Sequence, residues 1–234
     1  MNDISTSFSI AMSLIGAGDS ELWRIVGLSL EVSVASTFFA CLIGFPLGAL
    51  VGIRPFPGRR IVIVILNALL GLPSVVVGLV IYLMLSRAGP LGALGILFTP
   101  GAIVIAQTVL VFPFVTALAR QFVNDGWLEY RETLLSMGIT VGRAVGTLLW
   151  DLRYSLITVA LAAFGRAASE VGAVMVVGGN IDGVTRVMTT AIALETSKGD
   201  LPLALGLGIV LLMIVLLINA AAFSVREWSF ARHG

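Results

Sequence analysis

Five apolar runs, each long enough to cross a membrane as a helix, dominate this sequence. The runs lie at approximately residues 25–52, 61–86, 100–119, 155–179 and 201–225. A membrane-spanning helix needs about 20 largely apolar residues. The chain is only 12% charged, whereas a typical soluble domain is about 25% charged. The sequence therefore predicts an all-α membrane protein with about five transmembrane helices.

The residues outside these runs exclude several classes of protein. A net charge of +1 gives no reason to expect a nucleic-acid partner. The single cysteine, Cys41, and the single histidine, His233, cannot build a disulfide or a Cys/His metal site. The first 23 residues contain no Lys or Arg, so they lack the positive start of a signal peptide. Ile4–Ile15 is apolar but too short to span, and we expect an interfacial helix there.

Three of the runs contain helix-breaking residues. Gly44-Phe45-Pro46, Gly71-Leu72-Pro73 and Phe112-Pro113 each interrupt an otherwise apolar segment. Membrane helices tolerate such residues where neighbouring groups satisfy the freed backbone. A packing kink is the favoured interpretation of each proline, and a bend that shapes a pathway is the alternative.

The distribution of basic residues predicts the orientation in the membrane. One set of loops and the C-terminal tail hold nine of them, against four on the other side. The nine are Arg54, Arg59, Arg60, Arg120, Arg131, Arg143, Arg153, Arg226 and Arg232; the four are Arg24, Arg87, Arg186 and Lys198. Basic residues accumulate in cytoplasmic loops. We therefore expect the N-terminus outside and the C-terminus in the cytoplasm.

The fourth run contains ionisable residues at an unusual depth. On a continuous helix, Arg166, Ser169 and Glu170 would share one face, flanked by Gly165 and Gly172. Small residues at this spacing let another helix approach closely. Arg166 and Glu170, four residues apart, could form an ion pair that clamps helices together. Charged residues within membranes more often line a polar pathway, so a translocation pathway or gate is the favoured interpretation.

The segment between the third and fourth runs is too charged to span. From Trp127 it has an amphipathic pattern, with Trp127, Tyr130, Leu134 and Met137 on one stripe. Gly138 is a natural helix stop, and Thr140 can cap a second short helix. A helix–glycine–helix unit can enter a partner's groove or pack on its own protein, and the pattern alone does not decide between them.

The sequence RETLLSMG (131–138) resembles the EAA loop of ABC-importer permeases. Glu132 and Gly138 match that loop, whereas Thr133 and Leu134 stand in place of its two alanines. Three further segments are similar to the molybdate/sulfate/tungstate permeases, and 185–200 is most similar to the tungstate members. The three are SLEVSVASTFFACLIGFPLGAL (29–50), GLPSVVVGL (71–79) and FGRAASEVGAVMVVGGNI (164–181).

This resemblance implies that the chain is the permease subunit of an ATP-driven importer and forms the transmembrane pathway for an oxyanion. Tungstate is the favoured substrate, ahead of molybdate and sulfate. It implies a type I permease-like fold, with one domain over residues 1–234, a core of 22–225 and a cytoplasmic coupling loop of about 120–153. Two ATPase subunits would dock at about 125–150, through Tyr130, Glu132, Thr133 and Gly138. An extracytoplasmic binding protein would deliver the substrate, and ATP and Mg would bind only in the ATPase. The expected location is a bacterial or archaeal cytoplasmic (inner) membrane.

Five transmembrane helices are too few to surround a gated pathway, so we expect a homodimer with the pathway on its twofold axis. The polar stretch after Gly178-Gly179-Asn180 could meet an oxyanion or a binding protein, or it could be a solvated loop. The chain has no G-x-x-x-x-G-K-[ST], H-E-x-x-H or G-x-S-x-G motif, so we expect no enzymatic activity of its own. An ion-coupled carrier or channel for a small anion is the alternative, although no inverted repeat is evident. A membrane scaffold explains the two buried charges poorly.

Overall fold

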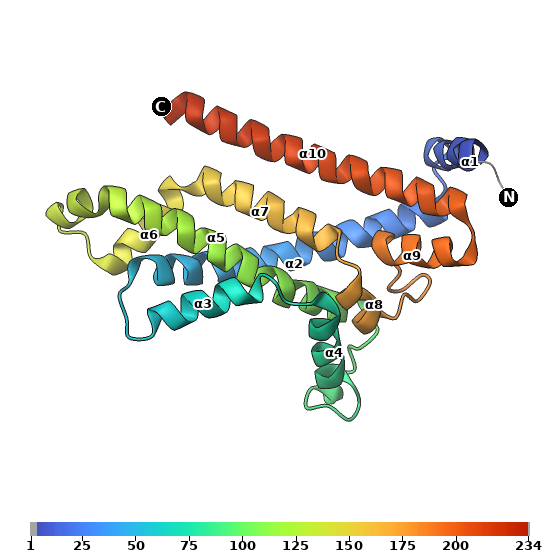
Figure 1. Ribbon diagram of the computed structural model, residues 1–234, viewed down its shortest axis with the longest axis horizontal. Helices are drawn as coiled ribbons and strands as arrows, with labels where there is room; N and C mark the ends of the chain where they lie inside the picture. Colours follow the sequence, from blue (N-terminus) through green and yellow to red (C-terminus); the bar gives the residue numbers. More distant parts are fainter. Residues whose placement is uncertain (1–3, 234) are drawn as a thin grey trace. The chain divides into compact units, whose positions relative to one another are not determined.

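The computed structural model describes residues 4–233, and every regular element in that range is helical (Figure 1). This confirms the predicted all-α class. The elements in chain order are α1 (Ile4–Ala17), α2 (Ser20–Ile53), α3 (Arg59–Leu69), α4 (Ser74–Leu85), the short 3₁₀ helix η1 (Gly92–Leu94), α5 (Pro100–Ser136), α6 (Val141–Asp151), α7 (Arg153–Ala168), α8 (Gly172–Gly178), α9 (Met188–Lys198) and α10 (Leu201–His233).

Length and composition identify the helices that can cross a membrane. Three described segments qualify outright: Ser20–Ile53, Pro100–Ser136 and Leu201–Ser224. Two sharply broken helix pairs, α3 with α4 and α6 with α7, raise the number to as many as five. The five predicted runs are therefore helical, but two of them are not single helices. The run at 61–86 consists of α3 and α4, and the run at 155–179 consists of α7 and α8.

The three groups of breaking residues behave differently. Pro46 lies inside α2 and Pro113 inside α5, and both helices continue through them. Pro73, by contrast, occupies the N-cap position of α4 with extended backbone (φ −64°, ψ 118°). Proline fixes φ and lacks an N–H, so it fits the start of a helix better than the interior. Here Gly71 precedes it, and the chain ends one helix before starting the next.

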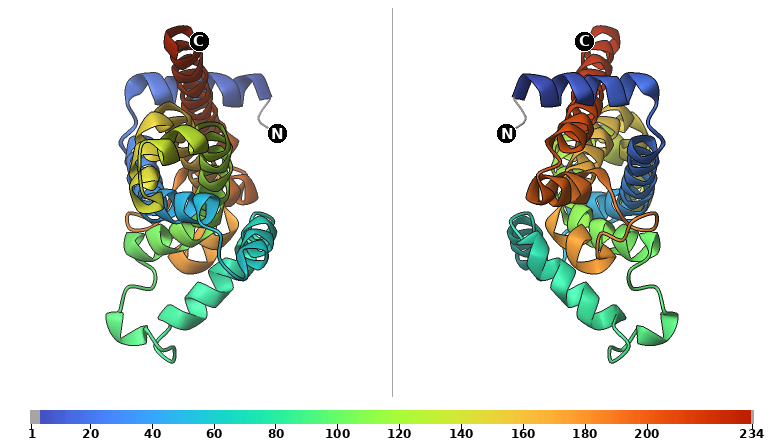
Figure 2. Two further views of the ribbon diagram at one scale, coloured as in Figure 1. Left: turned by 90° about the vertical axis from the view of Figure 1, so that its left-hand side faces the viewer. Right: turned by 90° about the vertical axis from the view of Figure 1, so that its right-hand side faces the viewer.

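The chain divides into two compact units. The first contains residues 4–36, 73–107 and 166–217. Its core is a cluster of buried residues from α2, α9 and α10: Leu22, Ile25, Val26, Met188, Ala191, Leu207 and Val210. α1 runs crosswise to the start of α2 (Figure 2). The predicted helix at Ile4–Ile15 is thus confirmed as α1, and its interfacial position stays a prediction.

The second unit contains residues 37–72, 108–165 and 218–233. Within it α2 and α5 touch through glycines four residues apart. A Cβ atom on Gly44 would lie 2.8 Å from Val115 Cγ1, one on Gly48 would lie 2.6 Å from the Thr116 carbonyl oxygen, and one on Gly52 would lie 3.0 Å from the Arg120 carbonyl oxygen. Small residues at this spacing let helix backbones meet. The two helices therefore pack backbone to backbone at Gly48 and Gly52, and at Gly44 the α2 backbone packs against the Val115 side chain.

Candidate functional site

The fourth apolar run is interrupted at the residues that we singled out. α7 ends at Ala168, and α8 begins only at Gly172. The prediction that Arg166, Ser169 and Glu170 share one face of a continuous helix is therefore wrong. The Ser169 hydroxyl donates to the Arg166 carbonyl at 3.2 Å, and the Glu170 N–H donates to the Ala167 carbonyl at 3.1 Å. Such local bonds close a turn in place of the next helical turn.

Two hydrogen bonds fix Glu170 in the break. Its carboxylate accepts from the Ala173 N–H at 3.2 Å, at the start of α8. Its backbone carbonyl accepts from the Thr189 hydroxyl at 2.8 Å, at the start of α9. A carboxylate is stabilised beside the free N–H groups at a helix start. Glu170 is half-buried, whereas Arg166 and Ser169 are exposed.

Gln107 stabilises the same break from α5. It is only 2% exposed, and its amide nitrogen donates to the Ala167 carbonyl at 3.0 Å. Its amide oxygen accepts from the buried Ser36 hydroxyl of α2 at 2.9 Å. Sequence reasoning missed Gln107, Ser36 and Thr189. A signal was present for Gln107, which is an uncharged polar residue within an apolar run, where polar groups must find internal partners.

Small residues bring α8 close to α4. A Cβ on Gly78 of α4 would lie 2.7 Å from the Ala173 Cα, and one on Gly172 would lie 2.7 Å from the Ser74 hydroxyl. The expected close approach of a helix at Gly172 is therefore confirmed, with α4 as the partner. α8 ends at Gly178, and Gly179 follows with φ +69°. This confirms the predicted end of the fourth apolar run at about residue 179.

The polar stretch after Asn180 is exposed at 181–184 and then continues into buried positions and α9. It contains α9, and its threonines bond internally. The buried Thr185 hydroxyl donates to the Gly178 carbonyl at 2.6 Å, and the buried Thr190 hydroxyl donates to the Val187 carbonyl at 3.1 Å. A buried hydroxyl needs a partner, and here the nearby backbone supplies it. These two threonines are therefore structural and do not face a ligand.

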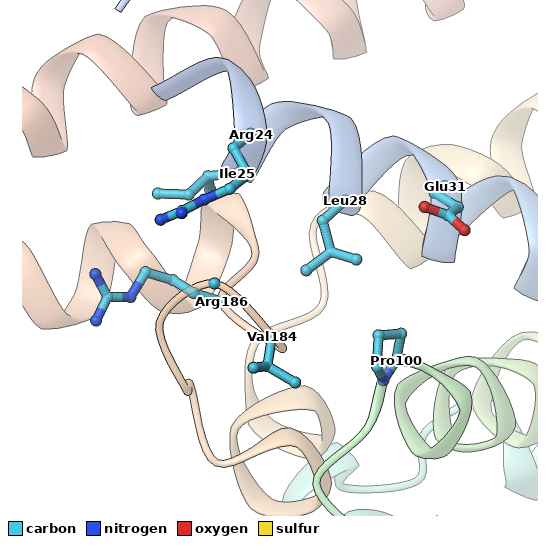
Figure 3. A pocket seen from close by; sticks show the side chains of 8 residues that line it. Arg24, Ile25, Leu28, Glu31, Pro100, Val184 and Arg186 are labelled. Atoms are coloured by element: carbon cyan, nitrogen blue, oxygen red, sulfur yellow. The ribbon is translucent and has the colours of Figure 1, made fainter. Parts of the chain in front are cut away.

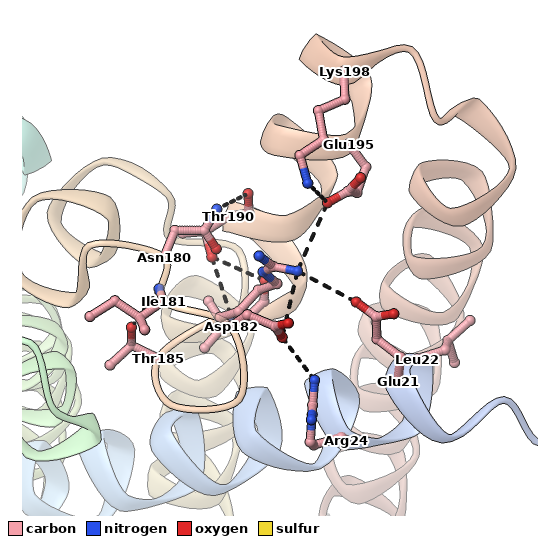
Figure 4. Close-up of polar contacts among 12 residues, drawn as sticks. Glu21, Leu22, Arg24, Asn180, Ile181, Asp182, Thr185, Thr190, Glu195 and Lys198 are labelled. Atoms are coloured by element: carbon pink, nitrogen blue, oxygen red, sulfur yellow. Dashed lines mark hydrogen bonds and ion pairs between the residues drawn. The ribbon is translucent and has the colours of Figure 1, made fainter.

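Ion pairs join α9 to the start of α2. The Arg186 guanidinium lies 3.4 Å from Glu21, 3.6 Å from Asp182 and 4.0 Å from Glu195. Arg24 pairs with Asp182 at 2.8 Å, and Lys198 with Glu195 at 2.9 Å. Figure 4 shows these side chains converging from α2, the 180–187 loop and α9. Arg186 is 12% exposed and Glu195 only 6%, so this network is partly desolvated.

A cavity of about 340 Å³ lies beside this network (Figure 3). It is lined by Arg24, Ile25, Leu28, Glu31, Pro100, Gly183, Val184 and Arg186. Both arginines already pair with carboxylates, and Glu31 adds a negative charge to the wall. The cavity therefore does not favour an anion over a cation.

The predicted docking segment includes the C-terminal end of α5. Trp127 and Leu134 are buried against α6, whereas Tyr130 and Met137 on the predicted stripe are 39% and 70% exposed. Glu132, Thr133 and Gly138 are also exposed. The Glu129 carboxylate raises the pKa of the Tyr130 phenol, with smaller contributions from burial and Asp151.

Gly138 ends α5 as predicted. Its φ is +72°, its N–H donates to the Leu135 carbonyl at 3.0 Å, and the Ile139 N–H donates to the Leu134 carbonyl at 3.0 Å. This pair of bonds is the Schellman motif, which favours glycine. Thr140 occupies the N-cap position of α6, but its side chain makes no capping bond. The helix–glycine–helix unit is thus confirmed, with α5 continuous from Pro100 to Ser136.

No family model matches the sequence, but individual proteins do. The chain is 41% identical over 97% of its length to the whole of a tungstate uptake system permease protein of Peptoclostridium acidaminophilum. It is 38% identical over 94% of its length to 99% of a probable anion ABC transporter permease protein of Haloferax volcanii. The chain belongs to the ABC-importer permeases of the molybdate/sulfate/tungstate group. A more distant member, a molybdenum transport system permease protein of Escherichia coli, is 29% identical to this permease over 76% of the chain and 82% of its own length.

The comparisons also establish the broad character of this permease. Both full-length relatives named above are described as permease proteins of uptake or ABC transport systems. Its long apolar helices agree with a multi-pass protein of the inner membrane.

Proposed function

We propose that this permease forms the transmembrane pathway through which an ATP-driven importer carries tungstate. The observation that carries the proposal is the 41% identity to a tungstate uptake permease over the full length of that protein. The tungstate relative named above is 41% identical to this permease, whereas the molybdenum relative of Escherichia coli is 29% identical. Tungstate therefore ranks before molybdate as the substrate.

Two ATPase subunits dock, in this proposal, at the far end of α5 and the start of α6. The support is an exposed surface around a glycine turn that combines Tyr130, Glu132 and Thr133 with the 70% exposed Met137. Exposed apolar side chains rimmed by polar groups are typical of protein interfaces. ATP and Mg bind in the partner subunits. A second copy of the permease completes the pathway, and an extracytoplasmic oxyanion-binding protein delivers the substrate.

The pathway or gate is assigned to Arg166, Ser169 and Glu170. Arg166 is exposed in the last turn of α7. The Glu170 carboxylate is directed to the Ala173 N–H, which offsets part of its repulsion of an anion. A divalent oxyanion near the break is therefore attracted by Arg166, and the Ser169 hydroxyl can donate to it once it leaves the Arg166 carbonyl.

Uptake in a reconstituted system tests this function. The permease is expressed with its ATPase and binding protein in cells that lack their own tungstate and molybdate uptake, and cellular tungsten is measured by mass spectrometry. We expect accumulation that requires an intact ATPase and that excess molybdate or sulfate inhibits weakly. Accumulation that persists with an inactive ATPase and stops when a protonophore is added would instead identify an ion-coupled carrier.

A further inference from the structure

An apolar groove lies within the second unit. Its volume is about 420 Å³. Its walls come from α2 (Cys41, Leu42, Phe45, Pro46), α6 (Leu149) and α7 (Arg153, Leu156, Ile157, Ala160). From Arg153 to Ala160 the groove extends about 10 Å along α7, at 1.5 Å per residue. One leaflet of the hydrocarbon core is about 15 Å deep, so the groove is long enough for a large part of one acyl chain.

Arg153 is the single charged residue in this lining, and it is the first of the lining residues along α7. Its guanidinium lies 5.2 Å from the centre of the Trp150 ring and 4.6 Å from that of Tyr154. It also donates to the Trp150 carbonyl at 2.9 Å. Among the side chains that the structure describes, no carboxylate lies within 4.0 Å of it. The positive charge is therefore oriented by two rings but not neutralised.

The two rings indicate where this end of the groove lies in a membrane. Trp150 is 73% exposed, and it stands where the charged segment of 120–153 gives way to the apolar α7. Tryptophan and tyrosine gather at the boundary between hydrocarbon and headgroups. Arg153 is thus at headgroup depth, and the apolar walls extend from it toward the hydrocarbon.

We infer that this groove binds an anionic phospholipid, with the phosphate on Arg153 and one acyl chain against α2 and α7. Charge complementarity favours this occupant. An apolar helix of a second copy would fill the groove but would offer Arg153 no anion, whereas a phospholipid supplies both the chain and the charge. Basic pockets between membrane helices at headgroup depth are recognised lipid sites.

Native mass spectrometry of the purified full-length permease in detergent tests the site. Phosphatidylglycerol and phosphatidylcholine with the same acyl chains are titrated separately. We expect wild type to retain phosphatidylglycerol preferentially. Arg153→Gln should lower that retention about fivefold, the factor that corresponds to about 1 kcal/mol per basic residue at an anionic lipid surface. Ala160→Trp should fill the groove and lower the retention of both lipids.

Arg143→Gln is the matched control, since Arg143 is exposed on α6 and lines no part of the groove. It should bind lipid as wild type does. Equal retention of the two lipids by wild type, or unchanged phosphatidylglycerol retention in Arg153→Gln, would overturn the inference. Loss of the dimer mass in Ala160→Trp with lipid retention unchanged would also overturn it, because a second copy would then be the occupant.

Discussion

Gln107 donates a hydrogen bond of 3.0 Å to the carbonyl of Ala167, in the last turn of α7. The same side chain accepts a bond from Ser36, so one amide links α2, α5 and the end of α7 within the first unit. The break before α8 is therefore not a frayed helix end. It has a dedicated buried partner on α5 and a second one, Thr189, at the start of α9.

Gln107→Leu should weaken this arrangement. It removes two hydrogen bonds at a buried position, which predicts a loss of about 1–3 kcal/mol in the free energy of unfolding. Ser36→Ala should cost less, because it removes only one of the two Gln107 bonds and leaves the Gln107 amide bonded to the Ala167 carbonyl. Thermal unfolding in detergent and tungstate uptake measure the two effects. An unfolding midpoint of Gln107→Leu equal to that of wild type would show that the amide does not hold the break.

Arg166→Gln should reduce tungstate uptake at least tenfold while the amount of permease in the membrane is unchanged. It removes the positive charge at the break but keeps a polar side chain of similar length. Arg166→Lys is the matched control, since it keeps the charge and should retain most of the uptake. If both variants transport as wild type does, Arg166 is not part of the pathway.

Gly48→Ala should destabilise the permease strongly, because the new Cβ would lie 2.6 Å from the Thr116 carbonyl oxygen. We expect a loss of about 1–3 kcal/mol, as for overpacking elsewhere. Gly146→Ala is the control on α6, where a Cβ would have no described atom within 4 Å. It should be neutral or stabilising by up to about 1 kcal/mol. Equal unfolding midpoints for the two variants would contradict the backbone contact between α2 and α5.

Gly138→Val and Glu132→Arg should each reduce co-purification of the ATPase. The first forces a β-branched residue to φ +72°, and the second reverses an exposed charge at the proposed dock. Gly27→Ala, on α2 outside the proposed dock and with no described atom within 4 Å of the new Cβ, should leave co-purification unchanged. If both test variants co-purify with as much ATPase as wild type does, the ATPase does not dock at this segment.

The orientation can be read from single cysteines in a Cys41→Ser background. Ser9→Cys on α1 and Ser136→Cys at the end of α5 both replace exposed side chains, whereas Ser7 is fully buried and would not report. A membrane-impermeant maleimide should label only the first variant in intact cells. The second should react only after the membrane is opened. The reverse pattern would place the proposed ATPase dock outside the cell.

Sequence alone predicted the apolar helices and the glycine stops well, because both depend on local properties. Gly138 and Gly179 end helices with positive φ where the pattern placed them. The break at Ser169–Val171 was missed, since it depends on Gln107 and Thr189, which lie far away in sequence. A helical wheel assumes an uninterrupted helix, and that assumption failed here. The stretch at 188–198 was not expected to be helical, because its many hydroxyl residues are typical of a solvated loop. The internal partners of these hydroxyl groups are visible only in the structure.

The glycine contacts between α2 and α5 have a mechanical consequence. Where side chains interlock, a joint can yield by rotating them. At Gly48 and Gly52 the α2 glycines lie directly against the α5 backbone, so there is little to rotate. Helices α2 and α5 should therefore move together as one rigid body where they are in contact. Because α5 runs on without interruption to Ser136, a force applied beside Gly138 would reach these glycines without passing a hinge.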